Sequence, residues 1–219
     1  MPDNTPALVV VAAGGLGTRV HGWARFIPKE FYPVSGRPGI TRLLEEIGAL
    51  GPARVAIVYH PYYEQFAAWG RQVLSPGGHA RYSREAGLDV PVAVPRCASI
   101  SLIPQRGPYG DLTSVFNGAD CLAAQESLYL AFADNLYPGA SPLELLRDAA
   151  DGDVAVAVLA STYRRALAPI RGILITSPAA DGEPRQVKTL VENRTRPRPG
   201  HWKTSTGPAT YSCWRAAPG

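Results

Sequence analysis

The sequence predicts an α/β fold: a Rossmann-like open sheet, mostly parallel and covered by helices on both faces. Two observations lead to this prediction. Short, unbroken apolar runs rich in β-branched residues recur along the chain, as is typical of strands buried on both faces of a parallel sheet. Between these runs lie segments whose apolar residues recur at helical spacing. A chain that alternates strands with helices forms a parallel sheet with helices on its two faces.

The first 150 residues contain four such strands and four such helices. The strands are expected at residues 7–12, 54–59, 99–103 and 128–132. The helices are expected at residues 40–50, 63–74, 112–123 and 143–149. Glycine marks the ends of several of these segments, for example Gly14 after the first strand and Gly51 after the first helix.

The pattern changes after residue 151. Three further strands are expected, at residues 154–159, 172–176 and 186–191, with no convincing helix between them. Because no crossover helix separates them, we expect mixed or antiparallel additions to the sheet. Residues 193–208 are rich in proline, arginine, glycine and threonine without apolar periodicity, which predicts a loop. No second core is evident, so residues 1–219 are predicted to form a single domain.

Composition excludes several classes of protein. The chain has 219 residues, of which 46% are hydrophobic and 18% are charged, which is usual for a globular domain and unlike a disordered chain. No apolar run near the N-terminus approaches the roughly 20 residues of a membrane span, and the acidic Asp3 argues against a secretory signal. The three cysteines, Cys97, Cys121 and Cys213, offer neither a disulfide framework nor a metal-binding pair. We therefore expect a cytoplasmic protein with no membrane partner.

The net charge of +4 is concentrated near the C-terminus. Residues 185–219 hold seven basic residues and one acidic residue, whereas the first 184 hold 15 basic and 17 acidic residues. Such a segment can bind phosphate groups or nucleic acid. Aromatic residues are sparse there and no nucleic-acid-binding motif is present, so nucleic acid is the less favoured partner.

A glycine-rich loop after the first strand, residues 13–19, is the strongest candidate for a binding site. In an open α/β sheet, ligands bind outside the carboxyl ends of the strands. The glycines would let backbone N–H groups approach phosphate oxygens, and Arg19 could neutralise those oxygens. The loop matches neither the Rossmann fingerprint nor the Walker A motif. Taken alone, it fits a tight turn at the end of a strand equally well.

The residues after the loop make the pattern specific. The run GGLGTR at residues 14–19, IPKEFYPV at 27–34 and RP at 37–38 together resemble the N-terminal motif of the sugar-1-phosphate nucleotidyltransferases. They are most similar to the UTP:glucose-1-phosphate uridylyltransferase branch. Gln105, Gly107 and Gly110 resemble the base-reading segment, and FADNLY at 132–137 resembles the acidic motif in its glucose-1-phosphate thymidylyltransferase form. The similarity covers about residues 8–192.

The resemblance implies a bacterial transferase of nucleotide sugar biosynthesis, an enzyme of the EC 2.7.7 type. Such an enzyme transfers UMP or dTMP from UTP or dTTP to a sugar 1-phosphate or a related small phosphate and releases pyrophosphate. Residues 1–150 would be its nucleotide-binding core, and residues 151–219 would supply the acceptor-side strands and a basic loop. The family resemblance also allows a homo-oligomer.

The resemblance assigns the site residues as well. Arg19 and Lys29 would be catalytic, because they would neutralise charge on the phosphates. Asp134, at the carboxyl end of a strand, would bind the cofactor Mg²⁺. Nucleotide-binding residues would be Ala13, Gly14, Gly15, Gly17, Thr18, Gln105 and Gly110. Sugar or acceptor residues would be Gly172, Glu192 and Arg194.

Simpler interpretations stand beside these assignments. Gln105 has both a donor and an acceptor with which to pair with a pyrimidine edge, but Gln105 and Lys29 could equally be solvated surface residues. An aspartate after a strand, such as Asp134, is often a turn former or a helix cap. The aromatic residues near the second strand are expected to pack around it; they are Tyr59, Tyr62, Tyr63 and Trp69.

The chain departs from the family pattern in two places. Where the family has a lysine after its sugar-binding glutamate, this chain has Asn193, followed by Arg194 and Arg196. The aspartate that completes the family's metal site has no counterpart, since no acidic residue follows Glu192. We therefore expect a C-terminally shortened member of the family. A second hypothesis stays open, that of a non-catalytic nucleotide-binding regulatory homologue.

Overall fold

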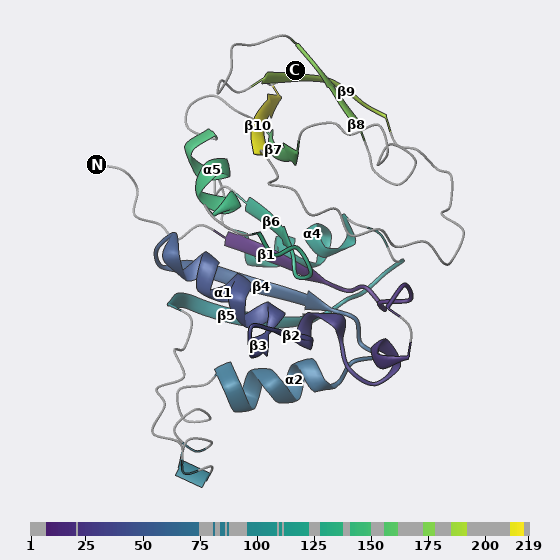
Figure 1. Ribbon diagram of the computed structural model, residues 1–219, viewed down its shortest axis with the longest axis vertical. Coiled ribbons are helices and arrows are strands. Elements are labelled where there is room, and N and C mark those ends of the chain that lie inside the picture. Colours follow the sequence, from purple (N-terminus) through teal and green to yellow (C-terminus); the bar gives the residue numbers. More distant parts are fainter. Residues whose placement is uncertain are drawn as a thin grey trace. The chain divides into compact units, whose positions relative to one another are not determined.

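A parallel sheet with the strand order β5-β4-β1-β6 organises the N-terminal part of the chain in the computed structural model (Figure 1). Its strands are β5 (Cys97–Pro104), β4 (Ala53–Tyr59), β1 (Leu8–Ala13) and β6 (Leu128–Phe132). The structure describes residues 8–20, 22–74, 81, 84–85, 87, 96–108, 110, 112–122, 128–137, 141–149, 156–161, 173–177, 185–191 and 211–216. The Rossmann-like fold that the sequence predicts is confirmed.

The two central strands are buried on both faces, as their unbroken apolar runs predict. β1 has side chains at most 1% exposed at Leu8, Val9, Val10 and Val11. Each fully buried aliphatic side chain of this size stabilises the fold by about 1.5–3 kcal/mol. The central pair of strands therefore forms the core on which the loops at the carboxyl ends are mounted.

Helices cover both faces of this sheet. α1 (Gly39–Ala49), α2 (Gln65–Trp69), the π-helical turn η3 (Gly70–Leu74) and α4 (Thr113–Gly118) connect its strands. Gly70 in η3 lies against Leu102, whereas Gly118 in α4 lies against Val10. Val10 packs in the same core cluster as Ile103 of β5. Ile103 follows Leu102 directly, and neighbouring residues of a strand point to opposite faces. Leu102 and Val10 therefore lie on opposite faces of the sheet. α2 with η3 and α4 therefore cover opposite faces.

The expected helix at residues 112–123 is shorter than predicted. It ends as an α-helix at Gly118 and continues only as the 3-10 turn η4 (Ala119–Cys121). A Cβ atom at residue 118 would lie 2.6 Å from Val10 Cγ2, so the helix approaches β1 at a residue without a side chain. Glycine also disfavours the helical conformation, which explains the early end.

A small hairpin that the apolar pattern does not predict precedes α1. β2 (Pro33–Val34) pairs antiparallel with β3 (Arg37–Pro38). The two residues between them, Ser35 and Gly36, have φ angles of 51° and 78°. Two positive φ angles in succession define the type I′ turn that suits a two-residue hairpin. Just before the hairpin lie two 3-10 turns, η1 (Trp23–Arg25) and η2 (Lys29–Phe31).

The chain divides into two compact units, residues 1–138 and 139–219. The second unit contains α5 (Pro142–Ala149), β7 (Val156–Ser161), β8 (Ile173–Thr176), β9 (Arg185–Val191) and β10 (Tyr211–Ala216). These strands pair in the order β7-β10-β9-β8 with both parallel and antiparallel neighbours, so the expected mixed pairing is confirmed. The single-domain arrangement with a core ending at residue 150 stays a prediction.

Candidate functional site

The candidate site lies where the loops after β1 and β6 meet. The order β5-β4-β1-β6 corresponds to strands three, two, one and four of the sheet in chain order. The direction of the connections therefore reverses between β1 and β6, and such a switch point is where open α/β sheets bind ligands. The backbone N–H of Ala133 donates to the carbonyl of Ala12 at 3.1 Å, which joins the two loops at their origin.

The glycine-rich loop leaves β1 in a tight turn. Gly14 is buried, whereas Thr18 and Arg19 are exposed. Gly17 has a φ of 60°, and the N–H of Val20 donates to its carbonyl at 2.8 Å. That backbone conformation strains any residue with a Cβ atom, so a glycine is required at this position. The turn presents Thr18 and Arg19 to solvent beyond the end of the strand.

Gln105 lies directly against this loop. A Cβ atom at residue 14 would lie 1.8 Å from the Gln105 Oε1 atom. Only glycine at position 14 therefore leaves room for the amide of Gln105 where it stands. The backbone of Gln105 is fixed by its N–H, which donates to the Tyr59 carbonyl at 2.8 Å. Two predicted nucleotide-binding residues, 91 positions apart in sequence, thus touch.

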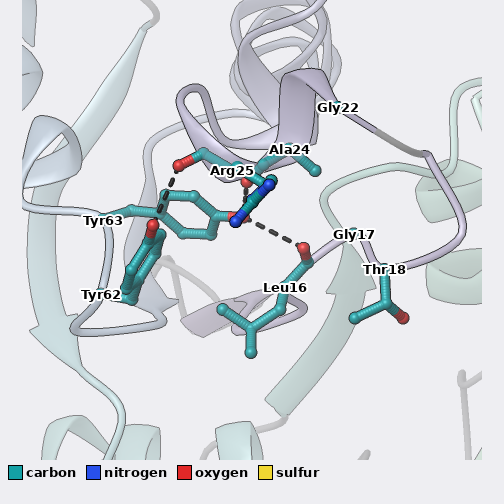
Figure 2. A pocket seen from close by; sticks show the side chains of 8 residues that line it. All are labelled: Leu16, Gly17, Thr18, Gly22, Ala24, Arg25, Tyr62 and Tyr63. Atoms are coloured by element: carbon teal, nitrogen blue, oxygen red, sulfur yellow. Dashed lines mark hydrogen bonds between the residues drawn. The ribbon is translucent and has the colours of Figure 1, made fainter.

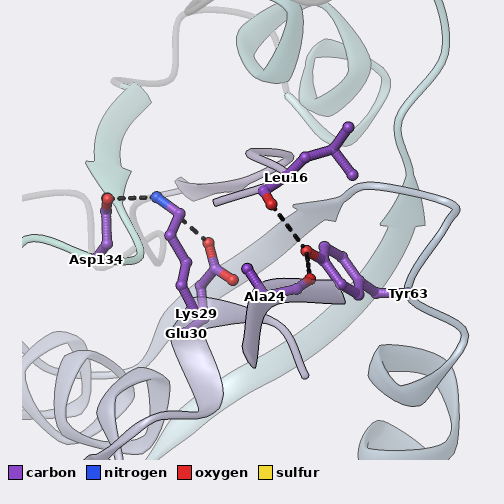
Figure 3. A network of polar contacts seen from close by, with 6 residues as sticks. All are labelled: Leu16, Ala24, Lys29, Glu30, Tyr63 and Asp134. Carbon is purple, nitrogen blue, oxygen red and sulfur yellow. Dashed lines mark hydrogen bonds and ion pairs between the residues drawn. The ribbon is translucent and has the colours of Figure 1, made fainter. Parts of the chain in front are cut away.

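Lys29 and Asp134 form an ion pair at the same edge of the sheet (Figure 3). Lys29 begins η2, and Asp134 lies two residues after the end of β6. The Asp134 side chain is 40% exposed and that of Lys29 is 18% exposed. The aromatic ring of Phe31, at the end of η2, packs on Phe66 with centroids 4.7 Å apart. This packing anchors the turn that carries Lys29.

Glu30 is a buried carboxyl group next to this pair (Figure 3). It is 1% exposed, and its Oε1 atom lies 3.7 Å from Lys29 Nζ. Within the part of the chain that the structure describes, neither carboxylate oxygen has a hydrogen-bond partner. Burial disfavours the charged form, and although Lys29 opposes this effect, the pKa of Glu30 is raised to about 7.

Tyr63 ties the loop to the turn that follows it. Its hydroxyl donates to the carbonyl of Ala24 at 2.6 Å and lies 3.1 Å from the carbonyl of Leu16 (Figures 2 and 3). Tyr63 is 1% exposed, so its expected packing role is confirmed. Tyr62 is 60% exposed instead, and its hydroxyl donates to the Arg25 carbonyl at 3.0 Å. Its ring packs edge-on against that of Tyr63, with centroids 5.2 Å apart, so Tyr62 packs on one neighbouring ring while most of its surface stays exposed.

A cavity of about 350 Å³ opens beside the same segment (Figure 2). Its lining residues come from the glycine-rich loop, from η1 and from the loop after β4; they are Leu16, Gly17, Thr18, Gly22, Ala24, Arg25, Tyr62 and Tyr63. Gln105, Lys29 and Asp134 are not among them. Two predicted nucleotide-binding residues, Gly17 and Thr18, do line it, so the cavity adjoins the glycine-rich loop.

Magnesium fits this site only together with a ligand that brings phosphate groups. Among the residues that the structure describes, no group of three or more His, Cys, Asp or Glu side chains could hold a metal. Mg²⁺ is usually held by one or two carboxylates plus the phosphates of a substrate. Asp134 provides one partly exposed carboxylate beside the glycine-rich loop, which suits that manner of binding.

The structure therefore brings together some of the predicted site residues and leaves others apart. Gly14 meets Gln105, and Lys29 meets Asp134. Ala13 is the buried last residue of β1, and Gly15 follows Gly14 in the loop. Arg19 makes no ion pair with any described residue. Gly110 lies three residues before Thr113, and the N–H of Thr113 donates to the Gly110 carbonyl at 3.0 Å. Gly172, Glu192 and Arg194 lie outside the described residues.

The roles of Glu30 and of the Tyr63 hydroxyl do not follow from the sequence patterns. The carboxyl of Glu30 stands next to Lys29 in the sequence, but nothing in the apolar pattern shows that it is buried. The partners of Tyr63 lie 39 and 47 residues away in the chain. Only the tertiary structure brings these groups together, so no local signal could have revealed them.

In the part of the chain that the structure describes, no helix is long and apolar enough to cross a membrane.

Comparison with known proteins identifies relatives in sequence and in fold. No protein-family model matches the chain. Bifunctional protein GlmU from Parvibaculum lavamentivorans is 33% identical over 75 residues, which are 34% of this chain and 16% of that protein. Its counterpart from Rhodospirillum rubrum is 35% identical over 63 residues, which are 29% of this chain and 14% of that protein. These matches thus span less than a fifth of the length of the curated relatives.

Similar solved structures include UDP-glucose pyrophosphorylases. The chain matches one that is complexed with UDP-glucose at a TM-score of 0.65 and 17% identity, covering 86% of this chain and 69% of that one. It matches a UTP-bound enzyme from Acinetobacter baumannii at a TM-score of 0.62 and 19% identity, covering 94% of this chain and 72% of that one. At these identities the likeness shows the fold. The resemblance to the sugar-1-phosphate nucleotidyltransferases that the motifs indicate is confirmed.

Proposed function

We propose that the chain is a sugar-phosphate nucleotidyltransferase that transfers UMP or dTMP from UTP or dTTP to a sugar 1-phosphate or a related small phosphate. One observation carries the proposal: at the switch point of the sheet, the Lys29–Asp134 ion pair and the contact between Gln105 and Gly14 stand beside the same glycine-rich loop. In the proposed reaction, Lys29 would neutralise charge, Asp134 would bind the metal and Gln105 would recognise the base. The chain matches UDP-glucose pyrophosphorylases in fold, which supports this reading.

The reaction asks for positioning and charge neutralisation more than for covalent chemistry by the protein. A phosphate oxygen of the acceptor attacks the α-phosphorus of the nucleotide, and the bond to the leaving pyrophosphate breaks. The exposed guanidinium of Arg19 and the ammonium of Lys29 would neutralise charge that develops on the phosphates. Backbone N–H groups of Gly15, Gly17 and Thr18 would hold the phosphates in place.

Asp134 would hold Mg²⁺ together with the phosphates of the nucleotide, and the ion would supply Lewis-acid stabilisation of the charge on those phosphates. While no nucleotide is bound, Lys29 neutralises Asp134. Once Asp134 binds Mg²⁺, the ammonium of Lys29 would be available to pair with the phosphates of the nucleotide. This exchange of partners would keep the charge of the site balanced in both states.

The acceptor is proposed to bind through Gly172, Glu192 and Arg194. An arginine provides a planar fork of donors where the family pattern has the point charge of a lysine, so the acceptor phosphate would be gripped in a different geometry. A cytoplasmic location and a homo-oligomer belong to the same proposal.

The test is a screen of pyrophosphate release that crosses four nucleoside triphosphates with a panel of sugar phosphates in the presence of Mg²⁺. Turnover with UTP or dTTP and one acceptor supports the proposal. Arg19→Ala and Lys29→Ala should each lower turnover by at least about tenfold. Arg96→Ala is a matched control, because Arg96 is exposed and precedes the amino end of β5, opposite the site.

No release across the whole panel refutes the enzymatic proposal. Tight nucleotide binding without turnover, unaffected by Asp134→Ala, would instead establish the non-catalytic regulatory homologue. Near wild-type rates in both the Arg19 and the Lys29 variants would show that the phosphates bind elsewhere.

A further inference from the structure

The side chain of Asn117 holds the backbone of the loop that carries Gln105. Its Oδ1 atom accepts a hydrogen bond from the N–H of Arg106 at 2.7 Å. Its Nδ2 group donates to the carbonyl of the same residue at 3.0 Å. A single amide side chain thus satisfies both backbone groups of the residue that follows Gln105, as a neighbouring strand would.

The orientation of Asn117 is itself fixed. Its Nδ2 group also donates to the carbonyl of Thr113, one turn earlier in α4, at 2.8 Å. Both N–H bonds of the amide are therefore used, and its oxygen is used once. Because two carbonyl oxygens face the same end of the side chain, rotation of the amide by 180° would place oxygen against oxygen.

The far end of the loop is attached to the same helix. Thr113 Oγ1 donates to the carbonyl of Pro108 at 2.7 Å, and the Thr113 N–H donates to that of Gly110 at 3.0 Å. Between these two attachments the chain bends at Gly107, whose φ is 90°. Thr113 and Asn117 thus attach Arg106, Pro108 and Gly110 to α4.

We infer that Asn117 is a positioning residue for base specificity: it fixes the loop so that the amide of Gln105 stands against Gly14, ready to pair with the base. This inference rests on the proposed function. Gln105 is held on one side by its own N–H bond to Tyr59 and on the other side by the bonds of Asn117 to Arg106. Loss of the second attachment leaves the amide of Gln105 free to meet bases of different shape, so discrimination falls while nucleotide binding remains.

The experiment measures the dissociation constants of UTP, dTTP, CTP, ATP and GTP by calorimetry for the full chain and its variants. Asn117→Ala should reduce the ratio between the preferred base and the others by about tenfold. Asn117→Asp keeps the acceptor oxygen and the size but loses both donors, so it should act in the same direction if the alanine variant does not fold. Phe116→Ala, at a residue on the same helix that is 73% exposed, is the control and should leave the ratio unchanged.

A double-mutant cycle shows whether Asn117 acts through Gln105. In the Gln105→Ala background, Asn117→Ala should produce no further change in base preference, although its effect on the melting temperature persists. An unchanged preference in both Asn117 variants, or additive effects in the cycle, overturns the inference. If the wild-type chain binds none of the five nucleotides, the proposed function itself has failed.

Discussion

The substitution Glu30→Gln is expected to make the protein more stable above pH 7 and to change its stability little near pH 4. Glutamine has the shape of the protonated carboxyl and carries no charge. Glu30 is 1% exposed, and in the described part of the chain its oxygens have no hydrogen-bond partner. Ionisation of this group therefore costs free energy in the folded protein that glutamine avoids.

The magnitude follows from the pKa of Glu30, which burial raises from 4.5 in the unfolded chain to about 7 in the folded protein. Between these values the native state keeps the proton and the unfolded state releases it. The unfolded state binds fewer protons there, so the free energy of unfolding falls as pH rises. The loss is up to about 1.4 kcal/mol per pH unit and about 3 kcal/mol in total. The stabilisation is complete below pH 4.5 and is gone above about pH 7.

The assay is denaturant unfolding of wild type and Glu30→Gln at several pH values between 5 and 8. The difference in unfolding free energy should widen in favour of the variant by about 2–3 kcal/mol over this range. Glu64→Gln is the control, because Glu64 is exposed. A difference that stays constant from pH 5 to pH 8 would show that Glu30 does not ionise in this range. Carboxyl carbon NMR should show the same titration directly, and the resonance should be absent in Glu30→Gln.

Three further substitutions test the packing around the site. Gly14→Ala should displace the amide of Gln105, whose Oε1 would lie 1.8 Å from the new Cβ. Nucleotide binding measured by calorimetry should weaken by about tenfold. The melting temperature of the variant should hardly change, because the flexible Gln105 side chain can move away. Gly118→Ala places a Cβ 2.6 Å from Val10 Cγ2 in the buried sheet, so denaturant unfolding should show a loss of about 1–3 kcal/mol; wild-type stability would contradict this packing. Tyr63→Phe removes a hydroxyl that lies within hydrogen-bond distance of two carbonyl oxygens. The free energy of unfolding should fall by about 1–2 kcal/mol. Tyr62→Phe, at the exposed neighbouring tyrosine, should lower it less.

The sequence was sufficient to predict the four strands of the parallel sheet and its first helix because their apolar patterns are strong. The strand predicted at residues 128–132 coincides with β6 (Leu128–Phe132), and the first helix differs by one residue at each end. The spacing of apolar residues within a short segment indicates which of its side chains are buried, and this spacing can be recognised from neighbouring residues alone. The β2–β3 hairpin was missed because two residues per strand are too few for a period. Its Ser-Gly turn was the available signal.

The candidate site was predicted in part for a similar reason. Motifs identify residues such as Lys29 and Asp134, and the structure brings this pair together across 105 positions of sequence. Asn117 belongs to no motif. Its importance depends on a backbone 11 residues away that turns back toward α4, and sequence patterns contain no information about such tertiary hydrogen bonds.

The backbone bonds at the ends of β5 and β6 have a consequence for amide hydrogen exchange. Gln105 and Ala133 each donate their N–H to a neighbouring strand, to Tyr59 and to Ala12. Because β5 and β6 are the edge strands of the sheet, exchange of these two amides requires only the end of an edge strand to separate from its central neighbour. Exchange measured residue by residue should therefore show that these two amides, which lie next to the residues that would meet the nucleotide, exchange faster than the amides of the central strands β1 and β4.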